Sequence, residues 1–403
     1  MRPRGLRAAL GTAAITVAAA LTAAGCGVGG GPQPTDQPTQ TSQPTSASPS
    51  PTSSDKPKAL ATNLSVPWGL AFLPDGGALV TERDKADILR ITPQGQVTPA
   101  GKVAGVVKGG EGGLLGIAIS PDFTTDQSVY AYYTSATDNR IVRMKWTESG
   151  QVDGSLKNQQ VILRGIPKGT VHNGGRLAFG PDGMLYASTG ETGRGSEAQD
   201  KASLGGKILR MTPDGAPAKG NPFHTLVWSY GHRNVQGMAW DAQRRMYATE
   251  FGQDRWDEIN RIEPGKDYGW PKVEGKGGGG KYVDPLVTWR TSEASPSGLA
   301  YAGSTLFAAA LKGQRLWTIP VGKSGQLGKP KALLTGVYGR LRTVVPAPDN
   351  KSLWVTTSNR DGRGEPRPGD DKVIMIPLKG KGKGGSPTPK PSKSGSKPNP
   401  SEL

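Results

Sequence analysis

One of the three histidines in this 403-residue chain lies in a stretch whose residue types suit chemistry. His172 is followed by an asparagine and two glycines, and small residues let a backbone or a ligand approach closely. A neutral imidazole removes a proton from a hydroxyl near neutral pH. Glu191 follows in a second glycine-rich stretch, where a carboxylate would orient an imidazole or hold a cation. The alternatives are a structural histidine and an ordinary acid of a surface loop.

A second group of candidates is cationic. Arg233 and Asn234 follow a Trp-Ser-Tyr-Gly-His run, and the guanidinium there would stabilise a developing oxyanion or pair with a carboxylate. Arg340 and Arg342 are two residues apart, a spacing that places both side chains on one side of a strand. This pair, with Lys312, could bind a polycarboxylate. The alternatives are a hydrogen-bonded turn for the first pair and solvated charge for the other cations.

Acidic residues gather in one short stretch, which favours a metal ion. Asp254, Asp257 and Glu258 fall within five residues, near glycine and backbone carbonyls, and such oxygen ligands suit Ca²⁺. The spacing is not that of an EF-hand, and an acidic surface turn is the alternative. Cys26 is the only cysteine, so the chain forms no intramolecular disulfide and offers no cysteine-based metal site.

A repeated turn indicates which scaffold positions these residues. Abundant glycine, recurrent Trp and Tyr, and short β-rich runs without a long amphipathic helical stretch are typical of an all-β protein. A turn like Pro-Asp-Gly before apolar residues recurs six times, with anchors at positions 74, 121, 181, 241, 303 and 348. Proline fixes φ, aspartate caps the turn and glycine accepts a positive φ. Six such units predict a six-bladed β-propeller over residues 59–378.

The N-terminus has the layout of an export signal. Three arginines precede an uncharged, alanine-rich stretch, so we expect a signal peptide over residues 1–25 and not a membrane span. The sequence LTAAGC ends at Cys26 and resembles a bacterial lipobox, which predicts a lipidated Cys26; export with a free thiol is the alternative. Residues 26–58, rich in Pro, Thr and Ser, are expected to form a disordered tether. The protein would then be a lipoprotein at the outer face of the cytoplasmic membrane.

The C-terminus and the overall charge add little about chemistry. Residues 379–403 are rich in Gly, Lys, Ser and Pro and are expected to form a disordered basic tail. Part of the formal net charge of +17 lies in the signal region and this tail. The sequence has no basic motif interleaved with aromatics and no pattern of a DNA-reading helix, so nucleic acid is not an expected partner.

Taken in order, the candidate clusters resemble the soluble quinoprotein glucose dehydrogenase and aldose sugar dehydrogenase family. Six segments carry the resemblance, namely residues 66–70 (VPWGL), 112–116 (GGLLG), 172–183, 229–237, 257–260 (DEIN) and 268–271 (YGWP). It implies a six-bladed propeller that binds pyrroloquinoline quinone (PQQ) and Ca²⁺ at its channel mouth and oxidises the anomeric hydroxyl of aldoses to lactones. Because the chain has no Cys-x-x-Cys-His haem motif, the electrons would leave to a separate, unknown acceptor.

The resemblance also implies roles for individual residues. His172 matches the general base that takes the sugar hydroxyl proton while hydride passes to the quinone, and Glu191 matches an acid that orients this base. Arg233 matches the residue over the quinone carbonyls, and the adjacent Asn234 would also contact the cofactor. The cations that match the holders of the cofactor carboxylates are Lys312, Arg340 and Arg342. The matches to calcium ligands are Gly252 and Gln253 at the cofactor, and Asp257, Glu258 and Tyr268 at a structural ion.

Two positions depart from the family pattern. Glu111 stands where a glutamine usually donates to the cofactor, and a carboxylate there would repel an anionic cofactor unless it is protonated or turned toward a cation. Gln253 replaces a proline, which matters less because only its carbonyl would be used. The alternative function is a non-catalytic envelope propeller that binds a glycan or a protein partner. A propeller lactonase is a third reading, but the sequence offers no convergent set of metal-binding acids for it.

Overall fold

The computed structural model describes residues 56–147 and 155–378. Several predictions concern other parts of the chain and lie outside the described residues. These are the signal peptide (1–25), lipidation of Cys26, disorder of the tether (26–58, apart from its last three residues) and of the basic tail (379–403).

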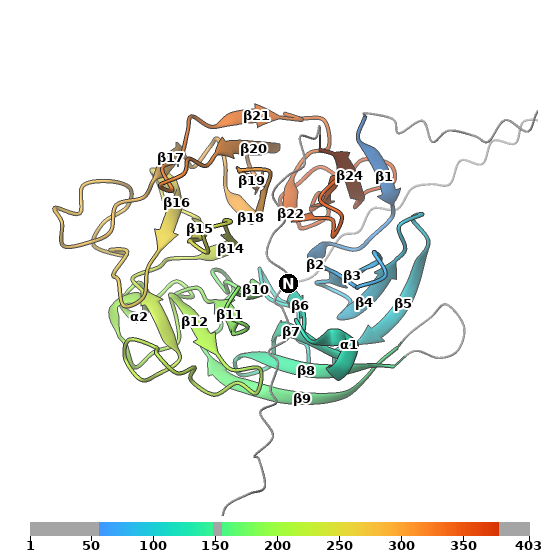
Figure 1. Cartoon of the computed structure of the whole chain (residues 1–403), viewed down its shortest axis with the longest axis horizontal. Coiled ribbons are helices and arrows are strands. Elements are labelled where there is room, and N and C mark those ends of the chain that lie inside the picture. Colours follow the sequence, from blue (N-terminus) through green and yellow to red (C-terminus); the bar gives the residue numbers. More distant parts are fainter. Residues whose placement is uncertain (1–55, 148–154, 379–403) are drawn as a thin grey trace, which may run out of the picture. The chain divides into compact units, whose positions relative to one another are not determined.

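Six four-stranded antiparallel sheets are arranged around a common centre (Figure 1). The first sheet contains β2 (Pro67–Phe72), β3 (Ala78–Glu82), β4 (Asp87–Ile91) and β5 (Val97–Lys102). The second contains β6 (Leu114–Ile119), β7 (Ser128–Thr134), β8 (Asn139–Thr147) and β9 (Ser155–Ile166). The third contains β10 (Leu177–Phe179), β11 (Leu185–Ser188), β12 (Lys207–Met211) and β13 (Val227–Tyr230).

The other three sheets repeat the pattern. The fourth contains β14 (Val235–Trp240), β15 (Met246–Glu250), β16 (Trp256–Ile262) and β17 (Val287–Arg290). The fifth contains β18 (Pro296–Ala302), β19 (Thr305–Ala310), β20 (Arg315–Pro320) and β21 (Lys331–Leu333). The sixth contains β22 (Leu341–Pro346), β23 (Ser352–Thr357), β24 (Val373–Pro377) and β1 (Lys58–Ala61). The all-β, six-bladed propeller predicted from the sequence is confirmed.

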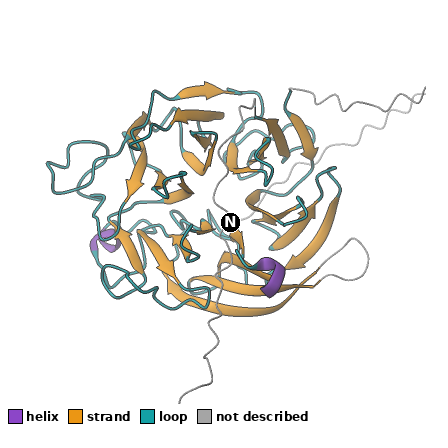
Figure 2. Ribbon diagram, in the orientation of Figure 1, coloured by secondary structure: helices purple, strands orange, loops and turns teal. Residues whose placement is uncertain are grey.

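Helix is scarce in the described residues (Figure 2). The helices there are α1 (Phe123–Asp126) and α2 (Ser196–Gln199), of four residues each. None of the helices in residues 56–147 and 155–378 is long and apolar enough to span a membrane.

Each repeated turn joins the first strand of a sheet to the second. In the first sheet, Asp75 Oδ1 accepts a hydrogen bond from the Gly77 N–H at 2.8 Å, and Gly76 adopts a φ of 84°. All six anchor positions fall between these two strands. The second strands β3, β7, β11, β15 and β23 are buried along their whole length, because they are covered on both faces by neighbouring sheets. Their apolar residues are therefore continuous rather than alternating.

Five of the six innermost strands, all but β10, have a local distortion near their beginnings. The register with the second strand shifts between Pro67 and Leu70 in β2, and at the corresponding place in β6, β14, β18 and β22. Such bulges change the direction of the side chains that they contain. They carry Trp68, Gln236 and Arg342, and all three line one small cavity at this end of the inner strands.

Candidate active site

His172 and Glu191 form a close pair. The His172 Nδ1 lies 2.5 Å from the Glu191 Oε1, and the carboxylate is only 2% exposed whereas the imidazole is 15% exposed. Because Glu191 engages Nδ1, Nε2 is the ring nitrogen left to receive a proton from a substrate. This geometry suits a general base oriented by a carboxylate.

The two loops that carry this pair approach each other very closely. His172 lies between β9 and β10, and Glu191 lies between β11 and β12. A Cβ at Gly190 would lie 1.8 Å from the His172 carbonyl oxygen, so a side chain does not fit there. His172 itself has a φ of 54°, in the left-handed region. The absence of a side chain at position 190 therefore brings the carboxylate within reach of the ring.

Glu111 is turned toward a cation. The sequence predicts that a carboxylate at this position repels an anionic cofactor unless it is protonated or faces a cation, and the second condition is met here. The Glu111 Oε2 accepts a hydrogen bond from the His172 N–H at 2.8 Å, and its Oε1 pairs with the Arg363 Nη1 at 2.7 Å. Burial alone would raise the pKa of Glu111, but the His172 amide and Arg363 outweigh it and hold that pKa below its usual value. Glu111 is therefore an ionised, paired carboxylate.

Arg233 and Asn234 lie between β13 and β14, close to the histidine loop. Arg233 Nη1 donates to the Gly252 carbonyl at 2.8 Å, and its backbone N–H donates to Glu250. Asn234 Oδ1 accepts from the Gly174 N–H at 3.0 Å, which connects it to the loop of His172. Burial lowers the pKa of Arg233, although nearby carboxylates, first among them Glu191, oppose this.

Three buried polar atoms of this group have no hydrogen-bond partner among the described residues. They are the Glu191 Oε2, the Arg233 Nε and the Asn234 Nδ2. Buried polar groups in native proteins are nearly always paired, by protein, water or ligand. The three atoms therefore indicate a place where a polar ligand would complete the hydrogen bonding.

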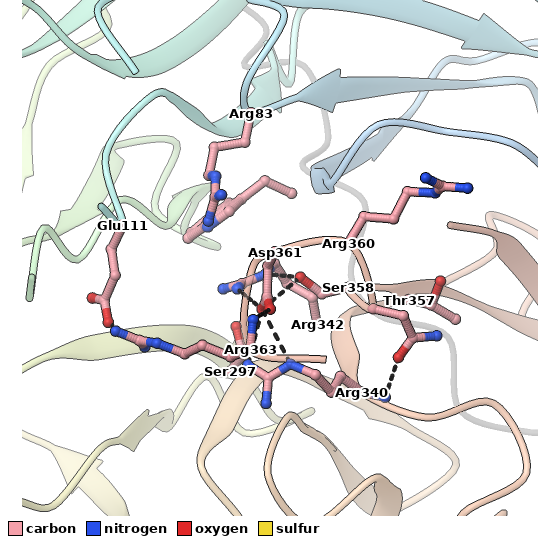
Figure 3. A network of polar contacts seen from close by, with 12 residues as sticks. Arg83, Glu111, Ser297, Arg340, Arg342, Thr357, Ser358, Arg360, Asp361 and Arg363 are labelled. Atoms are coloured by element: carbon pink, nitrogen blue, oxygen red, sulfur yellow. Dashed lines mark hydrogen bonds and ion pairs between the residues drawn. The ribbon is translucent and has the colours of Figure 1, made fainter. Parts of the chain in front are cut away.

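Arg340 and Arg342 converge on one carboxylate (Figure 3). Asp361 Oδ2 lies 2.9 Å from the Arg340 Nη2 and 3.3 Å from the Arg342 Nη2. Burial would raise the pKa of Asp361, but Arg342 and Arg340 outweigh it and lower that pKa. Burial also lowers the pKa of Arg342 to about 10. The two arginines that the sequence places together are thus brought together by Asp361, which had not been predicted.

A cavity of about 180 Å³ is lined by Glu111 and by the Arg342–Asp361 pair, and it adjoins the His172 loop through the Glu111 contact. Its lining includes Trp68, Glu111, Gln236, Arg342, Asp361 and Arg363. A second, mainly apolar cavity of about 450 Å³ lies at the other ends of the inner strands. Arg176 lines the larger cavity and stacks 4.4 Å from the Trp68 ring, which lines the smaller one. The smaller cavity is therefore the more highly charged of the two, with Arg83, Glu111, Arg342, Asp361 and Arg363 in its lining.

Lys312 lies apart from the arginine pair. It is exposed in the turn between β19 and β20, next to Leu311 of the cavity wall. In the described residues Lys312 has no contact with the side chains predicted to bind the ligand, and its role stays a prediction.

Gly252 and Gln253, the predicted calcium ligands at the cofactor, lie between β15 and β16. The carbonyl of Gly252 accepts a hydrogen bond from Arg233.

The acidic residues predicted to hold a structural calcium ion do not converge through their side chains. Asp257 and Glu258 are consecutive in β16 and therefore point to opposite faces of the sheet. Asp257 accepts the Gly252 and Ser295 amides, and its burial raises its pKa to about 6. The Tyr268 hydroxyl is bonded to the backbone of residues 261 and 263. Among the residues described, no group of three or more His, Cys, Asp or Glu side chains has the arrangement of a metal site.

Several functional contacts had not been predicted. The buried His232 lies between the Ser229 hydroxyl, at 2.8 Å, and Glu250, at 2.9 Å, and Glu250 in turn holds the Arg233 backbone. The sequence signal for Asp361 and Arg363 is the charged run 360–363 (RDGR), which follows a strand as the other candidates do. This run was not predicted to belong to the site, because it lies outside the six segments that resemble the dehydrogenase family.

Fold and site together define a β-propeller of the sugar dehydrogenase class. The chain belongs to the glucose/sorbosone dehydrogenase family, whose sequence profile matches residues 64–365. It is similar to the PQQ-bound aldose sugar dehydrogenase of Streptomyces coelicolor, with 56% identity and a TM-score of 0.77 over 79% of this chain and 96% of that one.

Two further relatives have lower sequence identity to this chain. The aldose sugar dehydrogenase YliI of Escherichia coli is 31% identical over 342 residues, which cover 76% of this chain and 90% of that protein. The quinoprotein glucose dehydrogenase B of Acinetobacter calcoaceticus is 33% identical over 252 residues, or 54% of this chain and 52% of that protein. The resemblance noted in the sequence is thus confirmed at the level of the family.

Proposed function

We propose that this protein oxidises the anomeric hydroxyl of an aldose to the lactone, with PQQ as cofactor. The observation that carries the proposal is the His172–Glu191 pair beside the unpartnered donors of Arg233 and Asn234. Oxidation of an alcohol removes a proton from the hydroxyl and a hydride from the carbon that bears it. It therefore needs a proton acceptor together with donors that stabilise the negative charge formed on the electron acceptor.

The polar residues at this end of the propeller fit an anionic, carbonyl-bearing cofactor. Arg342 and Arg340 offer buried guanidinium groups for carboxylates, and the unpartnered Nε of Arg233 and Nδ2 of Asn234 offer donors for carbonyl oxygens. When bound, PQQ would supply the acceptor for the two electrons that leave the sugar with the hydride. Lys312 would need to turn inward from its exposed position to join these cations.

His172 supplies the acid–base chemistry. Its Nε2 takes the proton of the anomeric hydroxyl as the C1–H bond gives up its hydride, and the C1–O bond becomes the lactone carbonyl. Glu191 holds the ring through Nδ1 and stabilises the imidazolium that forms. Arg233 stabilises the negative charge that accumulates on the electron acceptor.

Calcium is part of the proposal through backbone oxygens. The carbonyls of Gly252 and Gln253 are oxygen donors of the type that Ca²⁺ prefers. The Gly252 carbonyl also accepts from Arg233 Nη1 and has a second lone pair for an ion. The side chains of Asp257, Glu258 and Tyr268 would have to rearrange to hold a second, structural ion, because they do not converge.

The test is a titration of the purified protein with PQQ and Ca²⁺, followed by dye reduction with a panel of aldoses. We expect PQQ binding and sugar-dependent reduction, and we expect His172→Ala to abolish reduction while PQQ still binds. His224→Ala is the matched control, because His224 is exposed in the link between β12 and β13. A folded parent protein that does not bind PQQ would contradict the proposal.

A second function is favoured by one observation. Asp361 already pairs with both Arg340 and Arg342, the groups proposed for the cofactor carboxylates, and cancels one of their two charges. If Asp361 keeps the cofactor out, the protein is a non-catalytic propeller that binds a glycan or a protein partner. Failure to bind PQQ, with a glycan or protein bound instead, would support this reading.

We also propose that the protein is an exported lipoprotein of the cell envelope that passes electrons to a separate acceptor. The support is the signal-like sequence that ends at Cys26. Cys26→Ser should move the protein from the membrane fraction to the soluble fraction, as measured by fractionation and immunoblotting. An equal distribution of both forms would contradict lipidation.

A further inference from the structure

Glu111 connects the loop of His172 to the last sheet of the propeller. Its backbone N–H donates to the Thr170 carbonyl at 2.8 Å, and a Cβ at Gly110 would lie 2.0 Å from that same carbonyl oxygen. The segment that carries Glu111 is thus seated directly on the histidine loop. Its carboxylate then divides its two oxygens between His172 and Arg363.

The contact with His172 is to the backbone and not to the ring. The His172 N–H donates to the Glu111 Oε2 at 2.8 Å, while the ring is held by Glu191. Because His172 has a left-handed φ of 54°, an accepting group at its N–H helps to hold an unfavourable backbone conformation. Two carboxylates therefore fix one histidine, one through the backbone and the other through the imidazole.

Arg363 supplies the charge that Glu111 needs. It lies in the link between β23 and β24, and its Nη1 is 2.7 Å from the Glu111 Oε1. Glu111 is 17% exposed and lines the same cavity as Arg342 and Asp361. Without Arg363, an ionised carboxylate would face this cavity with only backbone partners, and it would repel an anionic ligand.

We propose that Glu111 and Arg363 form a positioning pair, in which Glu111 fixes the backbone of His172 and Arg363 cancels the Glu111 charge so that the cavity accepts an anionic cofactor. This inference rests on the proposed function, because it takes His172 as the base and PQQ as the ligand. It makes neither residue a catalytic one, since both act through the position of His172 and through the charge of the cavity.

A double-mutant cycle tests the charge part of the proposal. PQQ affinity in the presence of Ca²⁺ is measured for the full chain, Arg363→Ala, Glu111→Gln and the double variant. Arg363→Ala should weaken binding about tenfold or more in the parent, but less than about threefold in the Glu111→Gln background, where no charge is left to cancel. Equal losses in both backgrounds would overturn this part.

Arg194→Ala is the matched control for Arg363. Arg194 is 58% exposed at the side chain and pairs with Glu197, whereas Arg363 is 59% exposed and pairs with Glu111. Loss of the Arg194 pair should change PQQ affinity by less than about twofold, because neither Arg194 nor Glu197 lines the cavity whereas Glu111 and Arg363 do. A loss as large as that of Arg363→Ala would show a general charge effect and overturn the specific pairing.

The positioning part is tested without cofactor, through the imidazole NMR signals of the chain's three histidines. Glu111→Ala should shift the His172 signals and leave those of His224 and His232 in place, and Glu111→Gln, which keeps an accepting oxygen, should shift them less. Unchanged His172 signals in Glu111→Ala would overturn the role of Glu111. If no protein, parent included, binds PQQ, the proposed function fails, while this measurement still decides what Glu111 does.

Discussion

At the scale of single residues, the charge on Glu191 is what distinguishes an oriented base from a merely hydrogen-bonded histidine. Glu191→Gln keeps the size of the side chain but removes the charge that stabilises the imidazolium. We expect kcat for aldose oxidation to fall by about a hundredfold or more, with little change in PQQ affinity. Steady-state dye reduction measures this.

The control for that substitution is Glu197→Gln, which changes a partly exposed acid in α2 that pairs with Arg194. This variant should keep its activity within about twofold, as expected for an exposed pair. If Glu191→Gln is as active as Glu197→Gln, the role of Glu191 in catalysis is excluded.

Asp361 is the carboxylate that the buried pair Arg340 and Arg342 shares, so its charge bears on stability. Asp361→Asn leaves two buried guanidinium groups without their carboxylate, which should cost about 3 kcal/mol of unfolding free energy at pH 7. The folded pKa of Asp361 lies below its ordinary value, so its stabilisation is present above the unfolded pKa of about 3.9 and is lost as pH falls through the folded pKa.

Urea unfolding of parent and Asp361→Asn at pH 7 and near pH 3 measures this dependence. The difference between the two proteins should shrink at the lower pH. A difference that is the same at both values would mean that the carboxylate charge does not stabilise the arginine pair.

At the scale of elements, one glycine controls how two loops meet. Gly190→Ala places a methyl group against the His172 carbonyl and should separate the loops that hold His172 and Glu191. We expect kcat to fall at least about tenfold and stability to fall by about 1–3 kcal/mol. Gly109→Ala is the control, because a Cβ at Gly109 has nothing within 4 Å.

Kinetics and thermal unfolding of both glycine variants provide the measurement. If Gly190→Ala changes kcat and the melting temperature no more than Gly109→Ala does, the close approach of the two loops is not required for activity or stability.

The positions of the turns between strands could be predicted, because turn geometry depends on a few neighbouring residues. Pro, Asp and Gly set turn geometry within four residues, so all six anchors fall between first and second strands. The bulges that carry Trp68, Gln236 and Arg342 could not be predicted in this way, since they depend on pairing with a strand elsewhere in the chain. Arg340 and Arg342 could be predicted as a pair because they are two residues apart in the sequence. Their shared partner Asp361 could not, because it comes from a segment about 20 residues further along the chain.

At the scale of the whole molecule, the ring is closed by β1, which pairs with β24 through Lys58 and Met375 and through Ala59 and Ile374. The predicted boundary at residue 59 is close to the start of β1 at Lys58. The membership of β1 in the last sheet was not predicted, because nothing local in four residues indicates which distant strand they pair with.

The closure gives a stability prediction. Leu60 is 8% exposed and packs in a core cluster with Trp354 and Val373, so Leu60→Asp should lower the melting temperature by roughly 5–10 °C. Ala59→Asp, at an exposed position of the same strand, should change it by less than about 2 °C. Calorimetry that finds equal effects would contradict closure through the buried face of β1.

The joining of β1 to β24 also has a consequence for the order in which the protein is made. A ribosome releases β1 first and β24 last, so the first strand must wait for its partner until almost the whole chain has been synthesised. The same late segment contributes Asp361 and Arg363 to the cavity. A nascent or truncated chain that stops before this segment therefore has neither a closed ring nor a complete cavity, and both form only once the polypeptide is nearly finished.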